Sequence, residues 1–473
     1  MSNRTKNLFL AGLVLFYPGA AVFGQAEAPK TVSPAANGGD GKQEKPPVPT
    51  PTPTDPSQKE PGTEPQIKVS LRDGVHFKSD DGNFDIIIGG YIGIHYRWMA
   101  DRPNEQPNAP AATLRTSPDT WYIRQARPEI SGFIFKDFDF RLQMDFPTGP
   151  AAIDGTLQDC YAGWRHYSWL SLRVGQFKEP FGQEQTTPDR FLDFNERAQG
   201  DKFTPQRDIG AEAYGTIGGG IFTYELGWFN GQGRAVVDQN KGKEEAGRLR
   251  LQPFATADEG FLFKYFRVGV AGTIASNEKS PVTAFTSNTA YLNINYLTVA
   301  VPAATTVLDG ERSRWGGEAT WNYGPFGLRG EAWRRVDHAN TATLYHARIP
   351  TDAWSVQATW LVTGETKPIE GRLSPAKPFN PETGEWGAFE LAARVDRVRI
   401  GEEIFTTGIA SPATNANAVT GYSAGINWYL TRNIHVSPDF FWEVLNRDIP
   451  FPAAGGKLDS HFFGGIVRFQ LEF

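Results

Sequence analysis

The stretch "HFFGGIVRFQLEF", His461 to Phe473, alternates large apolar and polar side chains up to its last residue. Successive side chains of a β-strand point to opposite faces, so this pattern predicts a strand with one apolar face. Arg468, Gln470 and Glu472 fall on the opposite, polar face. Such a strand is expected where one side meets lipid and the other meets water. The apolar face consists of Phe463, Val467, Phe469, Leu471 and Phe473.

Other stretches from residue 84 onward show the same period of two, which indicates strands rather than helices. In "FDIIIGGYIGIHYRW", which begins at Phe84, a row of isoleucines opposes His95 and Arg97. A β-sandwich would alternate in a similar way, but it seldom places so many Trp and Tyr residues at strand ends. An apolar face with aromatic ends therefore favours a membrane barrel. Three further examples are "DFRLQMDF" (139–146), "DAWSVQATWLV" (352–362) and "GAFELAARV" (387–395).

The composition agrees with an all-β membrane protein and excludes several other classes. The chain has 33 Phe, 15 Tyr, 13 Trp and 50 Gly residues, which favour strands and tight turns. After the amino-terminal segment no run of about 18 apolar residues could form a transmembrane helix. A net charge of -6 gives no support for a nucleic-acid partner. Cys160 is the single cysteine, and no Cys/His spacing indicates a metal site, so neither metal nor cofactor is expected.

The links between strands are decisive for the architecture. We count sixteen strand-like runs, and the links between them alternate between short and long. Short turns at one end and long loops at the other are typical of an outer-membrane barrel. The sequence therefore predicts a 16-stranded antiparallel transmembrane β-barrel, closed without a free edge and wide enough for an aqueous channel. The short links are 136–137, 166–169, 216–220, 256–260, 322–327 and 430–433, and the long links are 99–120, 180–207, 231–246, 276–312, 337–351, 399–420 and 446–460.

One link breaks the alternation. Residues 363–387 form a long segment where a short periplasmic turn is due. The segment carries Lys367, Arg372 and Lys377, and it either hangs below the barrel or folds up into it. Both options stay open at this point.

The amino-terminal part of the chain has a different character. Arg4 and Lys6 precede the apolar run "LFLAGLVLF", which indicates a signal peptide over residues 1–26, with a buried helix as the alternative. The Pro-rich residues 27–66 are expected to be a disordered periplasmic linker, and the alternative is a tail that binds the cell wall. Residues 67–83 are a lead-in segment, and the barrel is expected to occupy residues 84–473.

Several stretches occur in the order found in a known family. The chain resembles the phosphate-selective porin O and P family from about residue 84 to its end. The resemblance implies a 16-stranded outer-membrane porin, usually a homotrimer, that favours anions such as phosphate or polyphosphate. Members of the family use lumenal arginines and loops that fold inward. The matching stretches include "YIRQARPEISGFIFKDFDFRLQMDF", "LQDCYAGWRHYSWLSLRVGQFKEPFGQE", "DRFLDFNERA", "QRDIGAEAYG", "WFNGQG", "EAGRL", "WGAFELAARVDRV" and "GINWYLTRNIHVSPDFFWEV".

The resemblance also implies where the pore is narrowest. The segment after "FKEPFG", residues 180–207, would be the inward-folded constriction loop, and it carries Arg190, Arg197, Lys202 and Arg207. Strand alternation places five further arginines in the lumen, where guanidinium groups could pass an anion along the pore. The alternative is that these charges keep the lumen wet and pair with carboxylates. The five arginines are Arg97, Arg141, Arg173, Arg394 and Arg468.

Acidic side chains on the lumenal face leave phosphate specificity open. Asp145, Glu225, Glu318, Glu331, Glu390, Asp396 and Glu472 fall on that face by the same alternation. The leading hypothesis is an outer-membrane porin for passive diffusion of small hydrophilic solutes, with an anion preference. The alternative is a non-selective general porin whose Pro-rich tail tethers the membrane to the cell wall.

An enzyme in a barrel scaffold is a remote third possibility. No His residue lies in a recognisable Ser/His/acid string, and no catalytic residue is assigned. The expected partners are the lipid bilayer, small anions or other solutes, and the barrel-assembly machinery, which reads a terminal aromatic strand.

Overall fold

The computed structural model describes residues 66–71, 74–100, 119–148, 155–236, 241–299, 307–340, 347–451 and 457–473. The chain divides into two units, and all described residues belong to the second, residues 64–473. The predicted signal peptide and all but the last residue of the Pro-rich linker lie outside the described residues.

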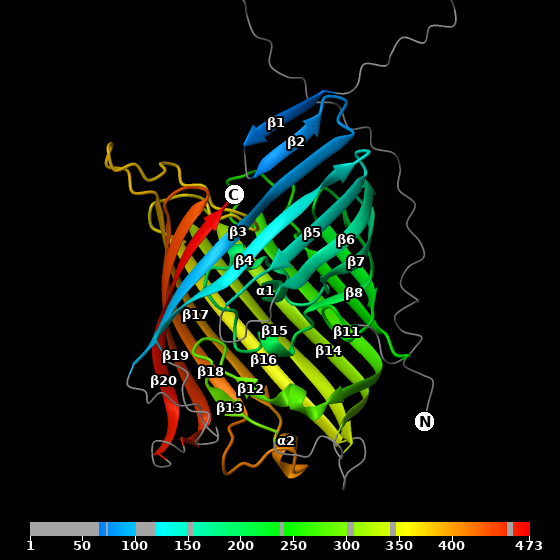
Figure 1. Cartoon of the computed structure of the whole chain (residues 1–473), viewed down its shortest axis with the longest axis vertical. Helices are drawn as coiled ribbons and strands as arrows, with labels where there is room; N and C mark the ends of the chain where they lie inside the picture. The colour runs from blue at the N-terminus through cyan, green and yellow to red at the C-terminus, as the bar shows by residue number, and fades with distance from the viewer. Residues whose placement is uncertain are drawn as a thin grey trace, which may run out of the picture. The chain divides into compact units, whose positions relative to one another are not determined.

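Within the described residues, sixteen antiparallel strands form one closed barrel (Figure 1). Each strand pairs with its neighbours in sequence order, and the last strand pairs with the first, with Glu472 opposite Tyr91. The predicted fold is therefore confirmed. The strands are β3 (Phe84–Met99), β4 (Thr120–Ile134), β5 (Phe138–Asp145), β6 (Thr156–Tyr167), β7 (Leu170–Lys178), β8 (Arg207–Ile217), β9 (Phe222–Phe229), β10 (Glu244–Leu251), β11 (Tyr265–Pro281), β14 (Val307–Tyr323), β15 (Phe326–Asn340), β16 (Ala347–Leu361), β17 (Ala388–Ile400), β18 (Ala418–Tyr429), β19 (Ile434–Phe451) and β20 (Lys457–Glu472).

The two faces of the barrel wall differ as the alternation predicts. On β20, Phe469 is 42% exposed on the outer face while Arg468 is 3% exposed on the inner face. Backbone groups within hydrocarbon have no water to bind, so each must pair within the protein. Closure of β20 on β3 meets this requirement, and it includes a hydrogen bond of 2.9 Å from the Gly90 amide to the Phe473 carbonyl.

Several predicted link boundaries are wrong. The links predicted at 337–351 and 446–460 are shorter, because β15 continues to Asn340, β16 begins at Ala347, β19 continues to Phe451 and β20 begins at Lys457. The link between β10 and β11 spans residues 252–264 rather than 256–260, because Phe254 and Phe261 pack against each other with ring centres 5.1 Å apart and hold a longer turn. The long link predicted at 276–312 is shorter, since β11 continues to Pro281 and β14 begins at Val307.

The lead-in segment forms a hairpin rather than an irregular connection. β1 (Ile67–Leu71) pairs with β2 (Val75–Ser79), and β2 pairs with residues 85–88 of β3. This hairpin lies at the same end of the barrel as the carboxyl terminus, and the loop containing α2 lies at the other end (Figure 1).

Part of the barrel interior is packed with apolar side chains from the loops. Phe181, Phe194 and Phe203 of the segment after β7 are buried together with Tyr291, whose ring stacks on inward-facing Phe441 at 4.4 Å. The loops contain short elements only, and no described helix has the length and apolar character needed to span a membrane. These elements are α1 (Gln183–Thr186), η1 (Asp189–Phe191), η2 (Asp201–Phe203), η3 (Val282–Phe285), β12 (Ser287–Asn288), β13 (Asn295–Leu297) and α2 (Glu403–Thr406).

Candidate functional site

The segment between β7 and β8, residues 179–206, lies inside the barrel and contacts strands far away in the sequence. The Asn195 amide donates to an Asp439 carboxylate oxygen at 2.6 Å, and the Asn195 side chain donates to the Ile466 carbonyl at 3.0 Å. The Gln199 amide donates to Asp396 at 2.8 Å. These contacts join the segment to β17, β19 and β20, so it crosses the lumen and narrows it. We call residues 179–206 the constriction loop.

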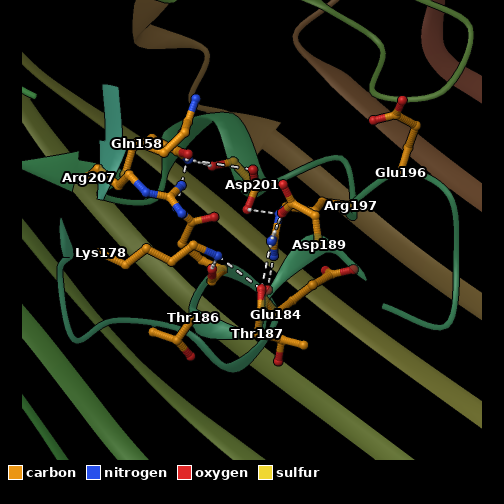
Figure 2. Close-up of polar contacts among 12 residues, drawn as sticks. Gln158, Lys178, Glu184, Thr186, Thr187, Asp189, Glu196, Arg197, Asp201 and Arg207 are labelled. Carbon is orange, nitrogen blue, oxygen red and sulfur yellow. Dashed lines mark hydrogen bonds and ion pairs between the residues drawn. The ribbon is translucent and has the colours of Figure 1, made fainter. Parts of the chain in front are cut away.

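Arg197 holds the constriction loop together from within (Figure 2). Its guanidinium group donates to the Thr187 carbonyl at 2.8 Å and pairs with the Asp189 carboxylate. Lys178, at the end of β7, donates to the same Thr187 carbonyl at 3.0 Å. Burial raises the pKa of Asp201, which lies 3.9 Å from Arg197, to about 6. Arg197 is therefore a structural residue of the loop.

Lys202 fastens the constriction loop to a neighbouring loop. Its ammonium group donates to the Thr286 carbonyl and lies 3.5 Å from the Ser287 hydroxyl. Burial lowers the pKa of Lys202 to about 8, and the charge of Arg335 acts in the same direction. Lys202 thus joins two loops across the lumen.

Arg394 and Arg468 point inward as predicted, but the constriction loop covers both. Arg394 pairs with Glu184 at 2.7 Å and lies 4.4 Å from the centre of the Phe194 ring. Arg468 lies 3.4 Å from the Leu192 carbonyl, which accepts its hydrogen bond. Their contacts anchor the loop, and neither side chain lines the two cavities described next.

Two cavities flank the constriction loop. The turn-side cavity, about 280 Å³, lies between the loop and residues 367–373, and the wall-side cavity, about 200 Å³, lies between the loop and the wall formed by β3 to β9. Thr186, Pro188 and Arg190 of the loop line both cavities, and so does Glu225 of β9. Basic side chains outnumber carboxylates by 8 to 5 in the first cavity and by 6 to 3 in the second. The basic residues are Arg190, Arg248, Arg250, Arg267, Arg329, Lys367, Arg372 and Arg432 in the turn-side cavity, and Arg127, Arg141, Arg173, Lys178, Arg190 and Arg207 in the wall-side cavity.

Besides Arg190, three predicted residues line the wall-side cavity, each beside a carboxylate. Arg141 pairs with Glu129 at 2.7 Å, and Arg173 pairs with Glu212 at 2.6 Å. Arg207 pairs with Asp159 at 2.7 Å. The prediction that Arg207 belongs to the loop is wrong, because the ladder pairs it with Lys178 and makes it the first residue of β8.

Arg190 occupies the junction of the two cavities. Its nearest carboxylate oxygens belong to Glu129 at 3.8 Å and Glu472 at 4.0 Å, which is longer than the close pairs of the wall. The guanidinium carbon lies 5.6 Å from the centre of the Tyr91 ring, and Gln470 donates to the Arg190 backbone carbonyl at 3.1 Å. Arg190 is therefore held in position, at a longer distance from its carboxylates than the close pairs of the wall, and it borders both cavities.

Arg97 lies apart from these residues. It is on the inner face, with its guanidinium carbon 5.9 Å from the centre of the Tyr122 ring, and it lines neither cavity.

The unusual turn segment, residues 362–387, folds partly into the barrel. The Lys367 ammonium group pairs with Asp193 of the constriction loop and with Glu390 of β17, the latter at 2.5 Å. Burial opposes a charge on Lys367, but the two carboxylates raise its pKa above the ordinary value. Arg372 pairs with Glu472. Lys377, by contrast, is largely exposed and pairs with Glu385 at 3.2 Å within the segment, so it does not reach the lumen.

Sequence reasoning missed six arginines that line the cavities. Arg248 and Arg250 flank the outward-facing Leu249, so the period of two in "GRLRL" could have identified them. Arg248 pairs with Glu318 at 2.6 Å. The same period of two is present in β4, β11 and β15, whereas Arg432 lies in the turn between β18 and β19, where alternation gives no signal. The six are Arg127, Arg248, Arg250, Arg267, Arg329 and Arg432.

Loss of the Asp439 anchor is expected to loosen the constriction loop. The Asp439→Ala variant removes the acceptor of the Asn195 amide, a charge-assisted hydrogen bond worth about 1.5–3 kcal/mol. We expect larger and noisier single-channel currents than for the unaltered protein. Asp352→Ala is the matched control, because Asp352 pairs with Arg334 at a half-exposed site. Equal conductance and noise in both variants would show that Asp439 does not anchor the loop.

Comparison with known proteins agrees with this architecture. Residues 107–447 match the model of the family described as phosphate-selective porin O and P. The chain is 21% identical over 398 residues to Porin O of Pseudomonas aeruginosa, which covers 78% of this chain and 85% of that protein.

Several solved structures share the fold at low sequence identity. DcaP of Acinetobacter baumannii has a TM-score of 0.50 at 9% identity, covering 84% of this chain and 99% of its own. OprB of Pseudomonas putida has a TM-score of 0.50 at 11% identity, covering 83% and 95%. OmpF of Salmonella typhi, in complex with daunomycin, has a TM-score of 0.50 at 12% identity, covering 86% and 100%.

A closed sixteen-stranded barrel with an apolar outer face and a charged, constricted lumen defines an outer-membrane porin. The chain belongs to the phosphate-selective porin O and P family, whose model matches more than half of its length. Membership of a channel family identifies it as a channel rather than an enzyme.

Proposed function

We propose that this porin conducts small hydrophilic anions by passive diffusion, with a preference set at Arg190. The observation that carries the proposal is the position of Arg190, where two cavities rich in basic side chains meet on either side of the constriction loop. Selectivity in a water-filled pore follows from its width and from the charges at its narrowest section. A guanidinium group suits this role because it stays charged and offers several donors in one plane.

The charges along the two cavities favour a moderate preference for anions rather than a strong one. Four arginines along the cavities, Arg141, Arg173, Arg207 and Arg248, have a carboxylate oxygen at 2.6–2.7 Å, which offsets their charge for a passing ion. Inorganic phosphate is the candidate permeant suggested by the family description. Polyphosphate is the second candidate that the family resemblance implies. A non-selective general porin is the outcome expected if pairing neutralises the lumen completely.

Reversal potentials in a salt gradient test the proposal directly. With potassium chloride on both sides of a planar bilayer, we expect the sign that corresponds to chloride permeating faster than potassium. Replacing chloride by phosphate should leave a measurable anion current. A reversal potential of zero, or one of the opposite sign, would contradict the anion preference.

We also propose the assembly that the family resemblance implies. The porin would form a homotrimer, inserted by the barrel-assembly machinery through its terminal strand, with the amino-terminal linker in the periplasm. The continuous apolar outer face of β20, which includes Phe463 and Phe469, supports this role for the last strand.

A further inference from the structure

A carboxylate of the turn segment occupies a pair of arginines on the pore wall. Arg267 donates to Glu370 Oε1 at 2.8 Å, and Arg250 donates to the same oxygen at 3.2 Å. The two arginines come from the neighbouring strands β11 and β10 and are largely buried. The Glu370 side chain is 63% exposed and lines the turn-side cavity. Glu370 thus lies where an anion in the cavity would meet both guanidinium groups.

The backbone around Glu370 is fixed to the barrel on its amino-terminal side. Arg329 donates to the Ile369 carbonyl at 3.3 Å, and Asn322 donates to the Pro368 carbonyl at 3.0 Å. The Lys367 amide donates to the Gly324 carbonyl at 2.8 Å. Each of these contacts joins the segment to a strand of the barrel or to the turn between β14 and β15. The backbone before Glu370 is therefore held in a position that places the Glu370 side chain beside the two arginines.

The carboxyl-terminal side is fixed as well. Gly371 has a φ of 99°, a left-handed conformation that glycine adopts without steric cost, and it turns the chain sharply after Glu370. Arg372 then pairs with Glu472 of β20. The backbone is thus fixed to the barrel on both sides of Glu370. The conformation of the turn segment therefore holds Glu370 in contact with the two arginines.

The charges of this site favour an ionised carboxylate. Partial desolvation inside the cavity would by itself raise the pKa of Glu370, but the charges of Arg267 and Arg250 hold this pKa below the ordinary value. Arg250 also lies 3.5 Å from Glu225, so Arg250 is shared by two carboxylates, whereas Arg267 pairs with Glu370. A carboxylate on a guanidinium group uses the same charge-assisted hydrogen bonds as a phosphate or carboxylate ligand.

We propose that Glu370 is an internal counter-anion that occupies an oxyanion-binding site formed by Arg250 and Arg267. This inference rests on the proposed anion function and adds a residue that sets the affinity of the pore for the permeating anion. A small oxyanion, such as inorganic phosphate, has to displace a carboxylate tethered beside the site. A tethered group competes at a high effective concentration, which weakens retention of the permeating ion. Weak retention favours conduction, since an ion must leave a pore site as readily as it enters.

The Glu370→Gln variant tests this inference with inorganic phosphate as the probe. The substitution keeps the shape of the side chain and removes its charge. Chloride current through single channels is measured while phosphate is added, and the phosphate concentration that halves the current is recorded. We expect this concentration to fall about tenfold relative to the unaltered protein, which corresponds to about 1.4 kcal/mol.

Two further variants make the result specific. Glu382→Gln removes a carboxylate from an exposed position of the same turn segment that does not line the cavity, and it should leave the half-blocking concentration unchanged. Adding Arg267→Gln to Glu370→Gln should abolish the fall in the half-blocking phosphate concentration, because the phosphate then loses one of its two guanidinium partners. Retention of the heat-resistant barrel band in electrophoresis establishes that each variant is folded.

The possible failures are distinguishable. If the unaltered porin prefers anions but Glu370→Gln leaves phosphate block unchanged, the counter-anion inference is overturned and the proposed function stands. The counter-anion inference is also overturned if Glu382→Gln lowers the half-blocking phosphate concentration as much as Glu370→Gln does. If the unaltered porin shows no anion preference, the proposed function is contradicted, and the inference that rests on it fails with it.

Discussion

Replacing Arg190 by glutamate is expected to abolish the anion preference of the pore or to invert it. Arg190 lies where the two basic cavities meet, and its nearest carboxylates are 3.8 and 4.0 Å away. Two unit charges about 4 Å apart interact by about 4 kcal/mol at an effective dielectric constant of about 20, and water in the lumen reduces this value. A change of about 1.4 kcal/mol or more is therefore expected, which is about tenfold in the permeability ratio of chloride to potassium.

The measurement is the reversal potential in a potassium chloride gradient, at low ionic strength where screening is weakest. Arg165→Glu is the matched control, because Arg165 carries the same charge but is half-exposed and lines neither cavity. Arg190→Lys retains the charge and should retain most of the preference. If Arg190→Glu and Arg165→Glu give the same reversal potential as the unaltered protein, Arg190 does not set selectivity.

A charge on the lipid-facing side of the barrel should cost much of its stability. Val395 lies on the outer face in the middle of β17, between Val356 of β16 and Tyr422 of β18. An arginine at the bilayer midplane destabilises a barrel by about 2–4 kcal/mol, because the side chain has no water and no partner there. We expect Val395→Arg to lower the free energy of unfolding in lipid vesicles by this amount.

Urea titration of the vesicle-embedded protein measures this loss, and Val395→Leu is the control that retains an apolar side chain. The leucine variant should differ by less than about 1.5 kcal/mol, which is usual for an apolar exchange of similar size. Equal stability of the arginine and leucine variants would mean that position 395 does not face hydrocarbon.

The wall of the barrel could be predicted because strand geometry is a local property. A side chain on a strand faces the opposite side from its neighbour whatever the rest of the chain does. This rule places Phe469 outward and Arg468 inward, and the structure agrees. The misplaced link boundary near Phe254 lies where the rule ends, since the length of that turn depends on aromatic packing rather than on alternation.

The roles of the inward-facing arginines could not be predicted in the same way. Arg190 and Arg394 carry the same charge, yet Arg394 is covered by a contact with Glu184, 210 positions earlier in the chain. Similarly, Lys367 enters the barrel and Lys377 stays outside, although both belong to one turn segment.

The sequence by itself determined the strand pattern, the lipid-facing side and the set of charges available to the lumen, because a period of two needs no information from distant residues. The tertiary structure alone decided which of those charges border open space. That outcome depends on the path of the constriction loop and of residues 367–372 across the barrel. Their paths are set by contacts such as those of Asn195 with Asp439 and of Glu370 with Arg267, whose partners are distant in the sequence.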